Sequence, residues 1–340
     1  MMVKKEAFVG RIFHFSNVRI ASAASVAGRE EHRGPLGGRF DYHDDSNRFG
    51  ASTWEQAEAA AVGMALTLAC KKWGERRAPE LLFAGDLQNQ CVASAEGLLP
   101  FGIPYIGLYG ACSTMTEGLL LASLALASGA VESAAAASSS HNAAAERQFR
   151  LPLEYGGQRT PTAQWTATAA GAYILEKGTH GVRITRGMAG RMVDGGISDA
   201  ANMGAAMAPA AADSILTFLS ETKTSAADYD AIVTGDLGRE GSVLLSILCE
   251  REGVRLCGKH ADCGCLLYDE KTQDAHAGAS GCGCSAAVLA AHYLPQLREG
   301  RLSRVLFLST GALMSPQSIA QGGSIYGVAP AILLEGGEDK

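Results

Sequence analysis

The sequence of 340 residues has few aromatic residues, few charged residues and no cluster of lysine or arginine. Aromatic residues make up 6% of the chain, charged residues make up 19%, and the formal net charge is −6. Because nucleic-acid binding needs a concentrated positive charge, we expect no nucleic acid among the partners. Long apolar runs are also missing. The longest, at residues 119–131, is too short to cross a bilayer and is predicted to be a core helix.

The N-terminus lacks the features of an exported protein. Its first residues, MMVKKEAFVGRIFHF, contain no apolar run of signal-peptide length and no small-residue cleavage site. The nine cysteines of the chain then fit a reducing compartment, in which most of them stay as thiols. We therefore expect synthesis in the cytoplasm without a signal peptide.

Motifs for metals and cofactors are also missing. The segment CGKHADCGC, at residues 257–265, is rich in cysteine but does not have paired Cys-x-x-Cys spacing. The glycine-rich turns lack the lysine and the strand-to-helix context of a phosphate-binding loop. We therefore expect neither a metal site nor a bound cofactor.

The chain does contain an alternation of short apolar strands and helices, which is typical of an α/β fold. Helices are predicted at residues 53–70, 208–219, 242–252 and 285–297. Thr53 is suited to cap the first of them. Residues 166–176 and 181–191 are predicted to form adjacent strands of opposite direction. The polar segment 29–49 is rich in turn residues, so we expect a long loop there.

An internal repeat divides the chain into two similar halves. LLFAGDL at residues 81–87 matches AIVTGDL at 231–237, and GACST before one helix matches CGCSA before another. We predict one half at residues 1–178, which includes the loop at 29–49, and the other half at 179–340. The alternating elements favour mostly parallel sheets covered on both faces, with a shared pocket at the carboxyl ends of the strands.

The sharpest candidate for a functional residue is Cys112, which follows a predicted strand and precedes Ser113 and a long helix. A cysteine at a helix N-terminus faces free N–H groups and the positive end of the helix dipole, which lower a thiol pKa and favour a bound anion. Cys112 is therefore a nucleophile, part of an anion pocket, or an inert buried cysteine. A nucleophile needs a base, which the second half should supply. The repeat places Gly235 and Asp236 there, and a carboxylate beside the thiol would oppose its ionisation.

Polar residues after the next strand form a second group of candidates. His141 and Asn142 end that strand, and they either line the pocket or form a polar turn. Glu146 is interpreted as one half of an i,i+4 ion pair on a solvated helix face. Arg147 or Arg159 is a candidate for clamping a carboxylate with two hydrogen bonds.

The GACST turn, the duplicated halves and the terminal STGALMS loop resemble the thiolase and ketoacyl-synthase superfamily. The resemblance implies a five-layered αβαβα fold built from two similar halves, and a homodimer. Cys112 matches the nucleophile position of that superfamily. The histidine, and the second histidine or asparagine, that activate the nucleophile would fall near residues 235–236 and 283, where this chain has neither. The resemblance therefore implies a pseudoenzyme. The alternative is an acyltransferase that uses Cys112 with His141 or His260 as an unfamiliar base.

Longer motifs, in order along almost the whole chain, resemble a narrower family, the stage V sporulation AD proteins of endospore-forming bacteria. They include GPLGGRFD, AGDLQNQ, SSSHNAAAERQFRLPLEYGGQ, KHADCG and TGALMSP. This resemblance implies a protein that binds dipicolinic acid, free or as its calcium chelate, and helps to load it into the developing spore. It also implies partners among the other stage V A membrane proteins, and a peripheral position at the forespore or spore inner membrane.

The residues expected to bind this ligand come from both halves. Dipicolinate is a planar aromatic dianion, so a helix N-terminus, an arginine and hydroxyl or amide donors would suit it. Asp86 and Asp236, one from each GDL motif, would repel the bare dianion but could meet its calcium, which prefers oxygen ligands. The full expected set is Asp86, Cys112, Ser113, His141, Asn142, Arg147, Asp236, Cys284 and Thr310.

Overall fold

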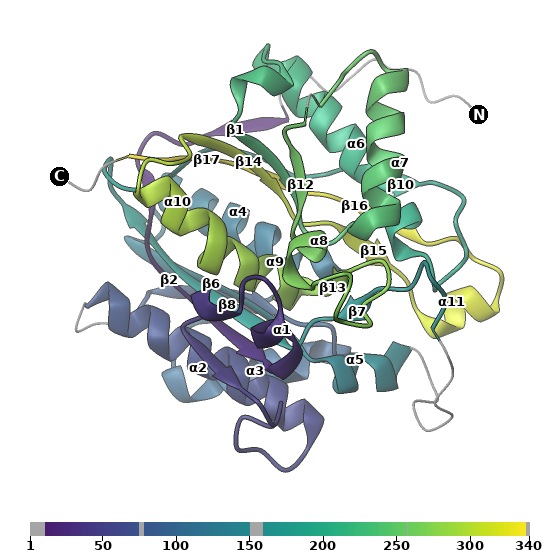
Figure 1. The fold of residues 1–340 in the computed structure, drawn as a ribbon. Helices are drawn as coiled ribbons and strands as arrows, with labels where there is room; N and C mark the ends of the chain where they lie inside the picture. Colours follow the sequence, from purple (N-terminus) through teal and green to yellow (C-terminus); the bar gives the residue numbers. More distant parts are fainter. Residues whose placement is uncertain (1–10, 75–77, 150–158, 257, 338–340) are drawn as a thin grey trace.

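The computed structural model describes residues 11–74, 78–149, 159–256 and 258–337 (Figure 1). A mixed sheet system runs through the molecule, and most of its strands belong to two sets of five. The first set, in spatial order from the centre, is β2 (Val18–Gly28), β8 (Ala169–Lys177), β6 (Ser133–Ser140), β4 (Leu81–Gly85) and β5 (Tyr105–Gly107). The second set, again from the centre, is β9 (Arg183–Met188), β17 (Ala331–Glu335), β14 (Arg304–Leu308), β11 (Ala231–Thr234) and β12 (His260–Asp262).

The two sets have the same topology. In each, the first strand along the chain lies at the centre and is followed in space by the fifth, the fourth, the second and the third. The fifth strand, β8 or β17, is antiparallel to both neighbours, whereas the remaining pairs are parallel. The sets meet where Arg19 of β2 pairs with Arg183 of β9. The fold is therefore built from two similar halves, and the predicted boundary after residue 178 falls in the connection between β8 and β9.

Helices form three layers around the two sets of strands (Figure 1). Between the sets lie α4 (Thr114–Ala127) and α9 (Cys282–Val288), whose buried side chains share one core with both sets. The outer face of the first set is covered by α2 (Trp54–Trp73) and α3 (Val92–Leu98). The outer face of the second set is covered by α6 (Met203–Thr222), with α7 (Gly238–Arg251) packed beside it. This order of layers confirms the predicted αβαβα fold.

The remaining elements surround the ends of the strands. Two small sheets consist of β10 (Val193–Asp194), β16 (Tyr326–Val328) and β15 (Gly311–Leu313), and of β13 (Ala279–Ser280) and β7 (Trp165–Thr166). The short helices there are α5 (Asn142–Phe149), α8 (Cys263–Leu267) and α11 (Pro316–Ala320), and α10 (Leu294–Arg298) continues α9 through a π-helical turn at Leu289–Tyr293. A further strand, β1 (Ile12–His14), pairs with β9.

The helices form where the sequence predicts them. Thr53 caps α2, since its side chain accepts a hydrogen bond from the Gln56 N–H. The segments at 208–219 and 242–252 lie within or across α6 and α7, and 285–297 lies across α9 and α10. By length and composition α6 could cross a membrane, but 67% of its apolar window is buried inside the molecule, as in a core helix.

Two predictions about local structure are wrong. The strands predicted to be adjacent, β8 and β9, are separated by β2, which is antiparallel to both. The reason is that β9 opens the second set of strands and therefore pairs with β17. The segment 29–49 is not a plain loop, because it contains α1 (Arg29–Arg33), a 3-10 turn at Gly37–Arg39, and β3 (Tyr42–Asp44), which pairs with β2.

The segment 29–49 is anchored by a buried carboxylate. Glu31 is 1% exposed and accepts hydrogen bonds from the Thr168 N–H, at 3.0 Å, and from the Tyr268 hydroxyl. Burial raises the pKa of Glu31 to about 7. Because Tyr268 belongs to the second half, this carboxylate ties the two halves together.

Candidate functional site

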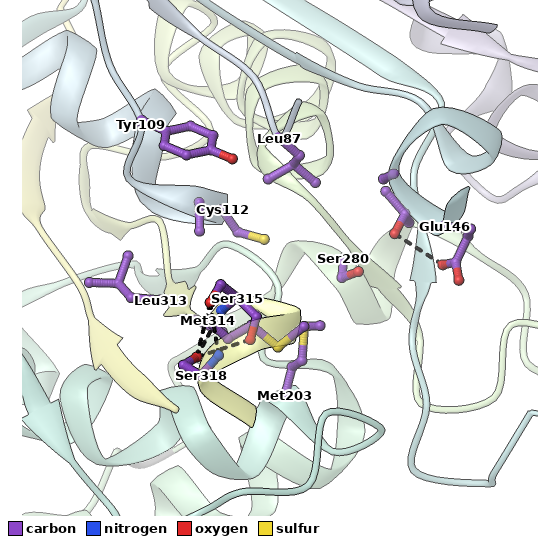
Figure 2. Close-up of a pocket in the computed structure, with 14 residues that line it drawn as sticks. Leu87, Tyr109, Cys112, Glu146, Met203, Ser280, Leu313, Met314, Ser315 and Ser318 are labelled. Atoms are coloured by element: carbon purple, nitrogen blue, oxygen red, sulfur yellow. Dashed lines mark hydrogen bonds between the residues drawn. The ribbon is translucent and has the colours of Figure 1, made fainter. Parts of the chain in front are cut away.

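A pocket of about 380 Å³ lies between the two halves, beyond the carboxyl end of β4 (Figure 2). From the first half it is lined by Leu87, Tyr109, Ala111, Cys112, Ala145, Glu146 and Thr166. From the second half it is lined by Met203, Ser280, Ala312, Leu313, Met314, Ser315 and Ser318. Figure 2 shows Cys112 between Tyr109 and the Met314–Ser315 segment, with Glu146 on the other side of Ser280.

Cys112 lies on a tight turn that leads into α4. Ala111–Ser113 forms a single 3-10 turn, and Ala111 has φ 52°, in the left-handed region that residues with a Cβ rarely adopt. Thr114 Oγ1 donates to the Ala111 carbonyl at 2.7 Å and so stabilises the turn. Cys112 is 6% exposed. Among the described residues of the expected ligand-binding set, Cys112 is the one that lines the pocket.

Asp236 contacts the thiol of Cys112 from the protein interior, outside the pocket lining. Its carboxyl group is fully buried, and it accepts hydrogen bonds from Thr310 Oγ1 at 2.7 Å and from the Gly281 N–H at 2.9 Å. The Cys112 thiol donates a further hydrogen bond to it. Burial raises the pKa of Asp236 to about 7, although the bonds from Cys112 and Thr310 oppose the rise. The second half therefore presents a carboxylate to the cysteine.

Asp86, the corresponding residue of the first half, is satisfied within its own turn. It accepts hydrogen bonds from the Gln88 N–H at 2.8 Å and from the Ser94 N–H and hydroxyl at 2.8 and 2.6 Å. Burial raises the pKa of Asp86. Neither Asp86 nor Asp236 lines the pocket, and both are fully buried. The expectation that these carboxylates meet a calcium ion is therefore corrected, since the protein covers both.

The other expected residues lie near the pocket without lining it. His141 is buried, with its Nε2 2.9 Å from the Asn47 carbonyl oxygen and its Nδ1 accepting from the Ala143 N–H at 3.2 Å. Burial lowers the pKa of His141. Asn142 begins α5, and its N–H donates to Thr168 Oγ1. These bonds describe a structured polar turn.

Three more members of the expected set also support the walls. Ser113 Oγ donates to the Gly110 carbonyl at 2.6 Å, and the Cys284 thiol lies 3.6 Å from the Gly235 carbonyl oxygen. Thr310 bonds Asp236, as described above. The side chain of Arg147 lies outside the described residues.

A row of oxygen-bearing residues in the pocket was not predicted from the sequence. Glu146 is 8% exposed and accepts a hydrogen bond from Thr166 Oγ1 at 3.3 Å, so it is not on a solvated helix face. Thr166 pairs in register with Ser280 in the parallel β7–β13 ladder, and both line the pocket. The spacing of Glu146 from Asn142 at the strand end was the available signal, because it places both on one face of α5.

The cysteine-rich segment at 257–265 forms part of the wall behind Asp236. His260 Nε2 lies 2.9 Å from Thr234 Oγ1, and burial lowers the pKa of His260 to about 4. Asp262 accepts hydrogen bonds from the Leu237, Gly238 and Cys265 N–H groups. Cys257 lies outside the described residues. Among the residues that the structure describes, no group of three or more histidine, cysteine, aspartate or glutamate side chains is placed to hold a metal ion.

Two duplicated halves around a cysteine at a helix N-terminus define a thiolase-like protein, and solved structures share this fold. Cerulenin-bound OleA of Xanthomonas campestris has a TM-score of 0.60 at 13% identity, over 94% of this chain and 98% of that chain. The 3-oxoacyl-[acyl-carrier-protein] synthase III of Aquifex aeolicus VF5 has a TM-score of 0.56 at 11% identity, over 94% of this chain and 99% of that chain. At these identities the likeness establishes the fold alone.

Sequence comparison places the chain within a narrower group. A profile of the family described as Stage V sporulation protein AD (SpoVAD) matches residues 11–335. Stage V sporulation protein AD of Bacillus subtilis (strain 168) is 42% identical over 317 residues, which cover 93% of this chain and 94% of that protein. The chain belongs to the Stage V sporulation protein AD family.

Proposed function

We propose that this sporulation protein binds dipicolinic acid in the Cys112 pocket, as its calcium chelate, for uptake into the developing spore, and that it does not catalyse acyl transfer. The observation that carries the second part is the hydrogen bond from the Cys112 thiol to the Asp236 carboxylate. A thiolate at this position would face a negative charge, so the contact favours the neutral thiol. Nucleophilic catalysis needs the opposite arrangement, in which a base stabilises the thiolate.

The two histidines considered as bases support the same proposal. The Nε2 atom of His141 lies 2.9 Å from a backbone carbonyl oxygen, and that of His260 lies 2.9 Å from Thr234 Oγ1. Burial lowers the pKa of both rings. The imidazolium form, which would stabilise a thiolate at Cys112, is therefore disfavoured for both at neutral pH.

The size and lining of the pocket support a small, flat ligand. Its volume of about 380 Å³ lies at the lower end of the range of roughly 300–1,000 Å³ that is usual for small-molecule sites. Leu87, Leu313 and Met314 offer apolar surface for an aromatic ring, and Thr166 and Ser280 offer hydroxyl groups for carboxylates. The choice of dipicolinate among such ligands rests on the family resemblance.

Isothermal titration calorimetry tests the ligand. Dipicolinate should bind in the presence of calcium, while picolinate, which lacks one carboxylate, and isophthalate, which lacks the ring nitrogen, should bind more weakly. A Cys112→Ser variant keeps the pocket size and should retain binding. Equal affinity for the three compounds would contradict the ligand assignment and leave the fold untouched.

One observation favours the alternative function, an acyltransferase. Because the pKa of Asp236 is about 7, its carboxylate could accept the Cys112 proton near neutral pH. A burst assay with an acyl thioester separates the two functions. We expect no stoichiometric acylation of Cys112. A burst that disappears in Cys112→Ala would overturn the proposal of binding without acyl transfer.

Partners and location are part of the same proposal. We infer a peripheral position at the forespore or spore inner membrane, through the other stage V A membrane proteins, and a homodimer. The dimer is supported by β5, which ends the described strand order and has Tyr105 and Ile106 39% and 44% exposed. Sedimentation velocity should give a dimer for the wild type and a monomer for Ile106→Lys.

A further inference from the structure

One rim of the pocket, formed by Leu87, Asn89 and Tyr109, carries an aromatic ring that is fixed in place by hydrogen bonds. We propose that the pocket recognises its ligand as an aromatic ring by stacking it on Tyr109, and that Gln148 on α5 is the positioning residue for this surface. The inference rests on the proposed function and adds the residues by which the site would distinguish a flat aromatic dicarboxylate from a saturated one.

Tyr109 lies between β5 and the Cys112 turn. It is 53% exposed, and among the described residues that line the pocket it is the aromatic one. Figure 2 shows its ring on one side of Cys112, with its hydroxyl directed towards Leu87, and Met314 on the other side. A flat ring bound beside Cys112 would therefore have Tyr109 on one side and the Met314 thioether on the other. Both kinds of side chain make favourable contacts with aromatic rings, beyond the burial of apolar area.

Gln148 joins the parts of this rim to one another. Its Nε2 donates to the Leu87 carbonyl oxygen at 3.1 Å and to Asn89 Oδ1 at 3.3 Å, and its Oε1 accepts from the Asn89 N–H at 3.2 Å. Asn89 Oδ1 also accepts a hydrogen bond from the Tyr109 hydroxyl at 3.2 Å. One amide side chain thus connects α5, the turn after β4 and the Tyr109 ring.

The backbone of the turn after β4 is a second, independent sign that the rim has a fixed shape. Gln90 has φ 61° and Cys91 has φ 51°, both in the left-handed region that residues with a Cβ rarely adopt. Such strained residues persist where their surroundings hold them, and they cluster at ligand-binding sites. The Cys91 thiol donates to the Leu108 carbonyl at 3.0 Å, which ties the turn to the residue before Tyr109.

Calorimetric titrations in the presence of calcium test the stacking, with dipicolinate and with its saturated analogue, the cis piperidine dicarboxylate. The analogue keeps both carboxylates and the ring nitrogen on a puckered ring. The measured quantity is the ratio of the two affinities, because a general loosening of the pocket weakens both ligands and leaves their ratio unchanged. For the wild type we expect a ratio of about tenfold in favour of dipicolinate.

Variants of Tyr109 show whether this ratio comes from its ring. In Tyr109→Leu, which keeps an apolar side chain without the ring, the ratio should fall by about threefold or more. Tyr109→Phe keeps the ring and should keep most of the ratio. Tyr42→Leu, which removes a tyrosine of β3 that is 41% exposed, is the matched control and should leave the ratio unchanged.

Variants of Gln148 test its positioning role. Gln148→Ala should lower the ratio by about twofold or more in the wild-type background and should have no further effect on it in the Tyr109→Leu background, because it acts through the Tyr109 ring. Gln56→Ala, which removes an exposed glutamine from α2, is the matched control. A decrease of the same size in both backgrounds would contradict the positioning role.

The outcomes separate this inference from the proposed function. If the wild type binds neither compound, the proposed function fails and the inference fails with it. If the wild type binds dipicolinate but Tyr109→Leu keeps the wild-type ratio, the stacking on Tyr109 is wrong while the proposed function stands. Equal affinity of the wild type for both compounds would overturn the inference in the same way. Thermal unfolding of each variant verifies that the pocket is still folded.

Discussion

The two GDL turns have the same sequence and the same place in their halves, but their carboxylates accept hydrogen bonds from different parts of the molecule. Asp86, after β4, accepts hydrogen bonds from its own turn and from the start of α3. Asp236, after β11, accepts one from Thr310 of its own half and another from Cys112 of the other half. Both carboxylates are fully buried. The first anchors a turn, while the second anchors a turn and the pocket cysteine together.

Their surroundings differ as well. Asp86 lies near Glu58, whose pKa is raised to about 8, chiefly by burial and also by the charge of Asp86. Asp236 lies near Asp262, whose pKa burial raises to about 6. Each half thus contains a pair of buried acids beside its turn. A duplicated carboxylate can thus anchor its turn in both halves and, in one half alone, also bind the cysteine of the pocket.

The largest expected effect is on stability. Asp86→Ala leaves two N–H groups and one hydroxyl without their acceptor in the interior, so the free energy of unfolding should fall by about 3 kcal/mol. Urea unfolding followed by circular dichroism measures the change. Asp45→Ala removes an exposed aspartate and should change stability by less than about 0.5 kcal/mol. An equally small effect of both variants would show that the Asp86 anchor is dispensable.

The second effect, which is smaller when it is counted per pH unit, is on the pH dependence of stability. Because burial raises the pKa of Asp236 to about 7 and of Glu58 to about 8, the folded protein binds more protons than the unfolded chain below these values. The free energy of unfolding should therefore decrease as pH rises from about 5 to 8, by up to about 1.4 kcal/mol per pH unit for each group.

Two variants show how much of this slope comes from each half, since Glu58 lies in the first half and Asp236 in the second. Asp236→Asn should reduce the slope below pH 7, and Glu58→Gln should reduce it below pH 8, because each removes a group that takes up a proton on folding. Part of the slope should remain, since burial also raises the pKa of Glu31 to about 7 and of Asp262 to about 6. Urea unfolding at half-unit steps of pH gives the profiles. A wild-type profile that survives both substitutions would contradict the protonation of these buried acids.

The smallest effect is on the reactivity of Cys112, and it compares the two turns directly. Removal of the carboxylate that accepts the thiol hydrogen bond should favour the thiolate, so Asp236→Asn should react with iodoacetamide about three- to tenfold faster at pH 8. Mass spectrometry of the Cys112 peptide measures the rate. Asp86→Asn is the matched control and should react like the wild type. An equal acceleration in both variants would break the distinction between the two turns.

The features predicted from the sequence are those that depend on local pattern. The GACST turn before a helix, the Thr53 cap and the repeated GDL motif all involve residues close together in the chain, and the structure contains each of them. The repeat also predicted two similar halves of alternating strands and helices, and the resemblance to the thiolase superfamily then implied the five-layered arrangement.

The features that were missed depend on contacts between distant segments. Glu146 looked solvated because its helix has polar neighbours, but the β7–β13 ladder covers it. The segment 29–49 was predicted to be a loop because it is rich in turn residues. The contacts that order it come from distant parts of the chain: β3 pairs with β2, and Tyr268 from the other half donates a hydrogen bond to Glu31. Sequence pattern carries little information on such pairings, since it does not fix which surface will cover a residue.

The middle layer has a consequence for the order of events during synthesis. Buried side chains of α4, from the first half, share one core with those of α9, from the second. The ribosome synthesises the first half before the second, so α4 and the inner face of its sheet remain exposed to solvent until α9 has been synthesised. Apolar surface exposed for that interval favours association between nascent chains, so the yield of folded protein should depend on how fast the last part of the chain is translated and on chaperones that cover the first part meanwhile.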